Sequence, residues 1–310
     1  MISKAIYALS AVQAIKIYGV EETCTSNIER MGAHASDFET YLGKGSPYTD
    51  KDFPPSTSSL FWDSFPNQKG EVSIKTDVVG WKRPSEIEGK TPSLWGSKGV
   101  QAAGVNQGSL GDCWFLAAAA AIAETPERIQ RIFKNKEYPA EGIFELQFYV
   151  KGKLVNEVID DKIPINSQGS PYSTKPSKNG AWWMPILEKA YAKLNMNYAQ
   201  ITGGNGDEAF RTLTGMPVMR YDTKDYTADQ IWTIASDGDH KNFIMYGGCC
   251  NMEFGNLVTE HAYTVYGVID LQQNGQSVQR LLKMRNPWGV EQYSGPWNDL
   301  DTKWTDDFKR

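Results

Sequence analysis

Cysteine is scarce in this chain, with four residues in 310. Four cysteines without a Cys-x-x-Cys pair are too few for the disulfide framework of a chain this long, so the sequence favours a reducing, cytoplasmic compartment. Long apolar runs are also missing, because the longest, Cys113 to Ala123, has about half of the ~20 residues that a membrane-spanning helix needs. A transmembrane segment is therefore excluded.

Blocks of positive charge are missing as well. The chain has 32 Lys and Arg against 37 Asp and Glu, a net charge of −5, and no basic stripe that would follow a phosphate backbone. This argues against nucleic acid as a partner. Hydrophobic residues at 40% and aromatic residues at 12% are ordinary for a globular protein, and the length fits one large domain or two lobes.

The first 59 residues carry weak structural signals. Apolar residues recur near helical spacing between Ile2 and Ile15, which favours an amphipathic segment. A cleaved signal peptide is the less favoured alternative, because Gln13 interrupts the apolar stretch and Lys16 closes it. Residues 21–59 are rich in Ser, Thr, Gly, Pro and Asp without apolar periodicity, so they predict a loop, a linker or an arm over a core.

Three helices are predicted in the middle of the chain. The alanine-rich run 113–123 favours a helix, and Thr125-Pro126-Glu127 is typical of the start of a second one that continues to Phe133. Between Trp182 and Leu194 the apolar residues fall on one helical face. This part of the chain therefore predicts a helical lobe.

The later sequence is richer in β-forming residues. Runs at 218–221, 263–269 and 279–284 are bounded by Gly, Asn and Asp and predict strands. Asn274-Gly275 is a hairpin signal, within a loop that we expect to be longer than two residues. The expected fold class is α+β, with a helical lobe followed by an antiparallel β-rich lobe.

Cys113 has the surroundings of a reactive thiol. It opens the alanine-rich helix, and free N–H groups at a helix N-terminus stabilise an anion, so we expect a lowered thiol pKa, especially beside an imidazolium. The candidate bases are His34 in the irregular arm, His240 in a loop and His261 at the start of a strand. Only His261 is expected on a rigid element.

A third residue completes the pattern. Asn286 follows the next predicted strand, and a side-chain amide can accept the imidazole N–H and orient the ring. Alone, a cysteine on an alanine-rich helix or a histidine at a strand start is more often structural. Here 148 residues separate Cys113 from His261 and 25 separate His261 from Asn286, an order and spacing typical of papain-type enzymes.

Gln107 lies six residues before Cys113. Its amide either joins the backbone N–H of Cys113 as the donor pair for an oxyanion, or caps a turn. Gly108 and Gly111 permit close backbone approach in both cases.

The run Gln107 to Trp114 resembles the cysteine box of the calpain family of proteases. The resemblance extends over about residues 48–310. It includes the following segments: Trp81–Pro84, Leu187–Lys193, Gly203-Gly204, His261–Tyr263 and Arg285–Gly289.

This resemblance implies a papain-like fold with the active site between a lobe at 48–206 and a lobe at 207–310, after an N-terminal arm at 1–47. It implies that Cys113 is the nucleophile, His261 the general base and acid, Asn286 the orienting amide and Gln107 the oxyanion donor. Trp288 matches an indole that shields the His–Asn hydrogen bond, although a plain core aromatic fits the sequence equally well. The implied activity is that of a cysteine endopeptidase that makes limited cuts in protein or peptide substrates.

The family resemblance also implies calcium in each lobe. The matching positions are Gly99 and Glu188 in the first lobe and Asp299 in the second, where the other acid is displaced to Glu291 and Gln292 stands at the matching place. Gly104 stands where the family has an acidic ligand, so we expect weakened calcium sites. The sequence stops at Arg310 before the family's lobe ends, which predicts a fragment or a curtailed lobe.

Glu260 replaces the small residue that the family usually has before the histidine. It would favour the imidazolium, disfavour acidic substrate side chains, or be a solvated surface charge. The altered calcium positions also support an alternative function, a catalytically silent scaffold or binding module. The intact set of Cys113, His261 and Asn286 favours the protease.

Overall fold

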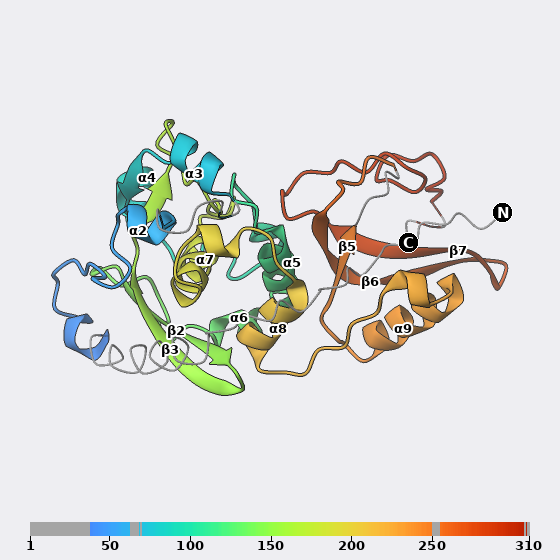
Figure 1. The fold of residues 1–310 in the computed structure, drawn as a ribbon. Helices are drawn as coiled ribbons and strands as arrows, with labels where there is room; N and C mark the ends of the chain where they lie inside the picture. The colour runs from blue at the N-terminus through green and yellow to red at the C-terminus, as the bar shows by residue number, and fades with distance from the viewer. Residues whose placement is uncertain (1–37, 63–67, 69, 250–254, 307, 309–310) are drawn as a thin grey trace.

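The computed structural model describes residues 38–62, 68, 70–249, 255–306 and 308. The predictions for His34 and for an amphipathic segment or signal peptide near the N-terminus lie outside these residues. The helices and strands, labelled as in Figure 1, are α2 (Thr57–Leu60), α3 (Glu71–Asp77), β1 (Gly80–Lys82), α4 (Pro84–Glu88), η1 (Ala102–Gly104), α5 (Cys113–Ile122), α6 (Pro126–Gln130), β2 (Ile143–Val150), β3 (Lys153–Asp160), β4 (Ile163–Ile165), α7 (Trp183–Leu194), η2 (Ala199–Ile201), α8 (Gly206–Thr214), η3 (Thr223–Asp225), α9 (Ala228–His240), β5 (Met245–Cys249), β6 (His261–Gln273) and β7 (Gln276–Arg285).

Helix α5 lies at the centre of the main hydrophobic core. Every residue from Trp114 to Ile122 is buried, as expected for a helix that is apolar on all faces. Five consecutive alanines favour the helix, and their small side chains let neighbouring backbones approach it closely. Helix α8 packs on one side of α5, and strand β6 packs on another.

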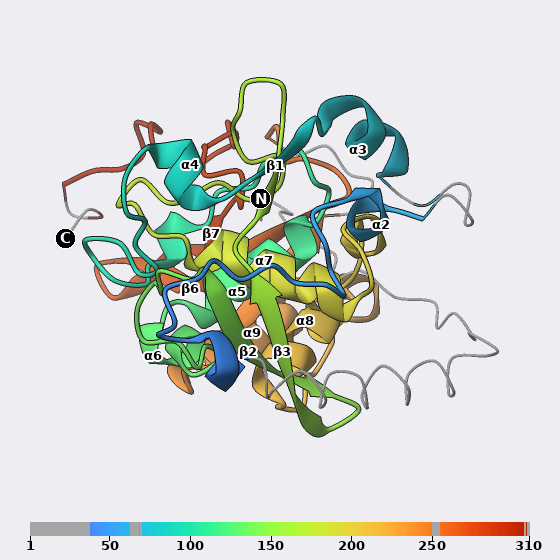
Figure 2. The ribbon, with the colours of Figure 1, turned by 90° about the vertical axis from the view of Figure 1, so that its left-hand side faces the viewer.

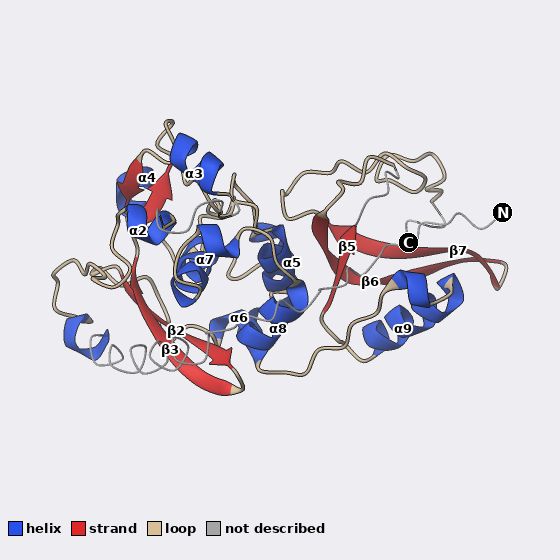
Figure 3. Cartoon of the chain, viewed as in Figure 1, coloured by secondary structure: helices blue, strands red, loops and turns tan. Residues whose placement is uncertain are grey.

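The N-terminal half of the described chain, residues 38–217, contains the helices α2 to α8, two antiparallel strand pairs and long loops (Figure 3). The antiparallel hairpin β2–β3 lies against α7, in front of it in Figure 2. Lys151 and Gly152 connect the two strands with φ of 49° and 76°, the left-handed pair that a two-residue hairpin turn requires. A second antiparallel pair joins β1 to β4.

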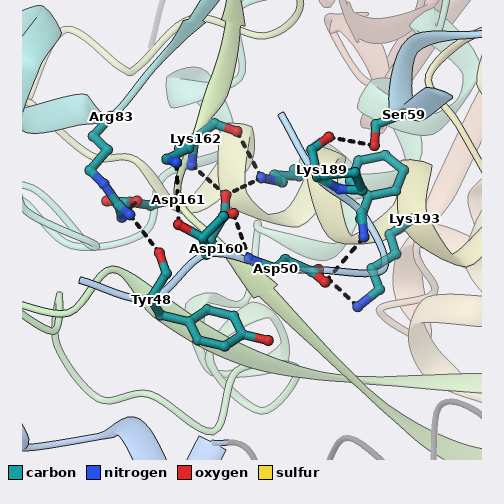
Figure 4. A network of polar contacts seen from close by, with 12 residues as sticks. Tyr48, Asp50, Ser59, Arg83, Asp160, Asp161, Lys162, Lys189 and Lys193 are labelled. Carbon is teal, nitrogen blue, oxygen red and sulfur yellow. Dashed lines mark hydrogen bonds and ion pairs between the residues drawn. The ribbon is translucent and has the colours of Figure 1, made fainter. Parts of the chain in front are cut away.

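Buried ion pairs hold the irregular segment before α2 to this half (Figure 4). Lys189 of α7 and Asp160 of β3 are both fully buried, with 2.5 Å between Nζ and Oδ1. Lys193 Nζ lies 2.9 Å from Oδ2 of Asp50, and the backbone N–H of Asp50 donates to Asp160. Asp50 thereby fixes the predicted arm over the core, at least in its part nearest α2.

The C-terminal half, residues 218–308, contains the three-stranded antiparallel sheet β5–β6–β7 with α9 against β6. Asn274 and Gly275 have φ of 54° and 75°, and Gln273 pairs with Gln276. The expected longer loop is therefore wrong: the turn has two residues. The strand predicted at 218–221 is also wrong, because this stretch has no strand partner and Met219 is 75% exposed.

Close contacts join the two halves beside α5. Thr264 of β6 donates its buried hydroxyl to the carbonyl of Ala117, at 2.8 Å. Arg285 at the end of β7 donates from Nη2 to the carbonyl oxygens of Ala103 and Val105, at 3.0 and 2.5 Å. The sheet's His261 end is thus placed against the N-terminus of α5.

Candidate active site

Cys113 is the first residue of α5 and carries a half-buried free thiol. Burial raises the pKa of this thiol, while the backbone N–H groups of Ala262, Trp114 and Cys113 itself act to lower it. The lowered thiol pKa expected from the sequence is therefore wrong, because desolvation raises the pKa by more than the N–H groups at the helix N-terminus lower it. The ligand-free site favours the neutral thiol.

His261 and Asn286 meet because of strand pairing. His261 begins β6, Arg285 ends β7, and the antiparallel register pairs Thr264 with Arg285. The residue after β7 therefore lies beside the first residues of β6. His261 Nε2 and Asn286 Oδ1 are 2.8 Å apart.

The hydrogen bonds around Asn286 assign the histidine tautomer. Asn286 Oδ1 also accepts the backbone N–H of Trp288 at 3.0 Å, so this atom is the amide oxygen. An oxygen can only accept, so His261 Nε2 must carry the hydrogen. In the neutral ring, Nδ1 then holds the free lone pair of a base.

The imidazole is neutral at rest. Burial lowers the pKa of His261, and the hydrogen bond to Asn286 only partly opposes this. Among the described residues, no hydrogen bond joins the ring to the Cys113 thiol, although the adjacent Ala262 N–H lies within reach of the sulfur. Thiol and base are thus neighbours without forming an ion pair in this structure.

Trp288 covers one side of the histidine. Its ring centroid lies 4.8 Å from that of His261 with 49° between the planes, and its side chain remains 36% exposed. The sequence is compatible with two interpretations of Trp288, a shielding indole and a plain core aromatic. An exposed tryptophan on a histidine is the arrangement that limits water access to the His–Asn contact, which favours the first interpretation.

Gln107 is held in a fixed orientation near the thiol. Its Nε2 donates to the carbonyl of Leu110 at 2.7 Å, and its backbone N–H donates to the carbonyl of Pro287 at 2.9 Å. The first bond uses one of the two amide hydrogens and leaves the second. A Cβ on the next residue, Gly108, would lie 1.7 Å from the carbonyl oxygen of Ser173, so only glycine fits there.

A buried carboxyl pair lies directly behind the thiol, and sequence reasoning missed it. Asp112 is fully buried and faces Glu188 of α7, which accepts hydrogen bonds from the backbone N–H of Thr174 at 3.0 Å. Asp112 makes no cap hydrogen bond to α5 and has no protein donor for either oxygen. Burial, and then the charge of Glu188, raises the pKa of Asp112, and burial also raises the pKa of Glu188, so we expect the two carboxyl groups to share a proton.

One sequence signal could have revealed this pair. Glu188 and Lys189 are adjacent charges inside a helix with apolar residues on both sides. Since α7 is buried on nearly all faces, each charge needs a buried partner, and these are Asp112 and Asp160.

Two of the four residues implied for calcium have protein hydrogen-bond partners in this structure. Glu188 is committed to Thr174 and Asp112 in the core, and the Gly99 carbonyl accepts from Asn179 Nδ2 at 3.3 Å. Glu291 and Asp299 are both exposed. Within the described residues, no group of three or more His, Cys, Asp and Glu side chains could hold a metal ion.

His240, another candidate base, lies apart from this arrangement. It ends α9, where it is exposed and its Nδ1 lies 2.7 Å from the carbonyl oxygen of Ser236. Cys249 ends β5, where the antiparallel register pairs it with His261, and Cys250 lies outside the described residues. A hollow of about 2340 Å³ beside α9 and β7 includes Asn286 in its lining but neither Cys113 nor His261.

No helix in the described residues has the length and apolar character needed to cross a membrane.

Residues 48–309 match the family model described as calpain family cysteine protease. The chain is 33% identical over 290 residues to a calpain-type cysteine protease ADL1 of Oryza sativa subsp. japonica, covering 87% of this chain and 13% of that protein. It is 33% identical over 276 residues to the human calpain-2 catalytic subunit, covering 85% of this chain and 38% of the relative. The chain thus spans well under half the length of these relatives.

Proposed function

The chain belongs to the calpain family of cysteine proteases, and we propose that it hydrolyses peptide bonds in protein substrates with Cys113, His261 and Asn286. The observation that carries this proposal is the pair of hydrogen bonds on Asn286 Oδ1, from His261 and from the Trp288 backbone. They leave Nδ1 as the basic nitrogen of a ring whose neighbouring residue, Ala262, contacts the Cys113 sulfur.

The proposed reaction begins from neutral groups. Because burial favours both the neutral thiol and the neutral imidazole, His261 Nδ1 removes the thiol proton as the sulfur attacks the substrate carbonyl carbon. Asn286 stabilises the resulting imidazolium through Nε2–H. The sulfur–carbon bond forms and the carbonyl π electrons move onto oxygen.

Two donors are available for that oxyanion. The remaining hydrogen of Gln107 Nε2 and the backbone N–H of Cys113, free at the start of α5, would both bind it. The oxyanion then collapses, the carbon–nitrogen bond breaks, and His261 gives its proton to the leaving amine. Water hydrolyses the thioester with His261 as base and regenerates the thiol.

The finer features of this function are also proposals. We propose a papain-like arrangement with the substrate cleft between two lobes. The sequence predicts their boundary near residue 206, and we propose to move it beyond Thr214, because α8 packs against α5. The steps above use only groups of this chain, and calcium binding at Gly99, Glu188, Glu291 and Asp299 is a separate proposal. Calcium modulation is an outcome that the next experiment measures.

The test is labelling of the purified chain with a peptidyl epoxide, with and without millimolar calcium, and location of the adduct by mass spectrometry. Selective labelling of Cys113 that is lost in His261→Ala, together with cleavage of an unfolded protein substrate, is the expected result. Cys113→Ala is the control for labelling of other thiols. Equal labelling of all four cysteines under both conditions, without cleavage, would refute the protease and favour the catalytically silent scaffold.

A further inference from the structure

Glu260 adopts a backbone conformation that is unfavourable for its residue type. Its φ is 52°, in the left-handed region where a Cβ is crowded and glycine is the usual residue. The side chain is exposed, so it gains no packing that would offset this strain. Non-glycine residues held in this region are concentrated at functional sites.

Glu260 is also close to the reacting groups. It directly precedes His261, and it is two residues before Ala262, whose N–H reaches the Cys113 sulfur. With 3.8 Å between consecutive Cα atoms and a hydrogen-bond length to sulfur, the Glu260 Cα lies within about 10 Å of that sulfur. This is on the order of one Debye length at physiological salt.

The Glu260 carboxylate has no ion-pair partner among the described residues. In the part of the chain that the structure describes, its side chain takes part in no ion pair or hydrogen bond. The other carboxyl groups near the thiol, Asp112 and Glu188, are fully buried behind it. Glu260 therefore supplies an exposed, uncompensated negative charge on the solvent side of the candidate site.

We propose that Glu260 is a specificity-determining residue that favours positively charged groups, and disfavours negatively charged groups, next to the carbonyl attacked by Cys113. This inference rests on the proposed function for its biological meaning. The electrostatic effect of Glu260 on the thiol does not depend on turnover, so the proposal for Glu260 and the proposed protease function can fail separately.

The experiment compares the rates at which a cationic and an anionic methanethiosulfonate modify Cys113, located by mass spectrometry. In Glu260→Gln the ratio of cationic to anionic rate should fall roughly three-fold at low salt, and about ten-fold in Glu260→Lys. Molar salt should remove most of the difference. Asp237→Asn, an exposed carboxylate on α9, is the matched control and should leave the ratio unchanged.

Glu260→Gly separates charge from backbone. It removes both the carboxylate and the strain, so it should match Glu260→Gln in reagent ratio while melting at a higher temperature than Glu260→Gln. An unchanged ratio in Glu260→Gln and Glu260→Lys would overturn the proposal, and so would a ratio that changes only in Glu260→Gly.

The same variants then test the substrate. Peptide pairs that differ only by Lys or Glu beside the cleaved bond should show a Lys preference in kcat/KM that falls by a similar factor in Glu260→Gln. A shifted reagent ratio with no cleavage of any peptide would leave the charge assignment intact and refute the protease. Cleavage with no change in the reagent ratio or in the Lys preference would refute the role of Glu260 and leave the proposed protease function intact.

Discussion

Replacing Asp112 by asparagine tests how the buried carboxyl pair behind Cys113 is held together. Asp112 and Glu188 are fully buried and burial raises the pKa of both, so we expect the pair to be held together by one shared proton. Asparagine presents an N–H donor at the same place. Asp112→Asn should therefore keep the hydrogen bond to Glu188 without the need to retain a proton.

The sign of the pH dependence follows from the direction of the shift. Burial and the charge of Glu188 raise the pKa of Asp112 above the value of about 3.9 expected in the unfolded chain. Above that pH the folded state binds more protons than the unfolded state, so the wild-type free energy of unfolding falls as pH rises. The slope is at most about 1.4 kcal/mol per pH unit for one proton. The asparagine variant does not lose stability in this way, so its free energy of unfolding should exceed that of the wild type by about 1–3 kcal/mol near neutral pH.

Urea unfolding of both proteins at about pH 4.5, 6.0 and 7.5 measures this difference. Asp225→Asn, which changes an exposed aspartate, controls for general charge effects. Asp112→Leu has a similar size and no donor, so it leaves the Glu188 charge unpaired and should lose about 3–5 kcal/mol near neutral pH. A pH-independent difference, or an asparagine variant as unstable as the leucine variant, would refute the shared proton.

Three further results are expected. Gln107→Ala should lower kcat by about 10²–10³ with little change in KM, because it removes one oxyanion donor; an unchanged kcat would assign Gln107 to the turn alone. Lys189→Met should lower the free energy of unfolding by about 3–5 kcal/mol in urea titrations, since it leaves Asp160 buried and unpaired, and a loss below about 1 kcal/mol would contradict that burial. Iodoacetamide alkylation of Cys113 in the ligand-free protein should continue to accelerate above the usual thiol pKa, since burial raises that pKa; a rate that is already constant near neutral pH would reveal an ion pair with His261.

Local sequence was sufficient for the elements that depend on local contacts. The alanine run and the Thr125-Pro126 start predict α5 and α6, and both begin where expected, although α6 ends at Gln130 rather than continuing to Phe133. Asn274-Gly275 predicts the β6–β7 hairpin, because a two-residue turn needs residues that readily adopt the left-handed backbone conformation. The same turn chemistry at Lys151-Gly152 was missed, although its hairpin also forms.

Propensity alone failed where no partner strand was available. Residues 218–221 have β-forming side chains, yet they cross between the two halves of the chain without a neighbouring strand. Strand formation depends on pairing and burial more than on the residue itself. Helix α9 was missed for a related reason, since its polar sequence has few buried residues to set a helical period.

The sequence by itself determined the family, the helices around Cys113 and the identity of the three residues proposed for catalysis, because these depend on residue types, their order and local turn chemistry. Only the tertiary structure determined the tautomer and the ionisation of these side chains. The antiparallel register placed Asn286 on His261 and assigned the tautomer, and burial left the thiol and imidazole neutral. It also paired Asp112 with Glu188, because desolvation and contacts between distant segments are properties of the packed chain that no local pattern encodes.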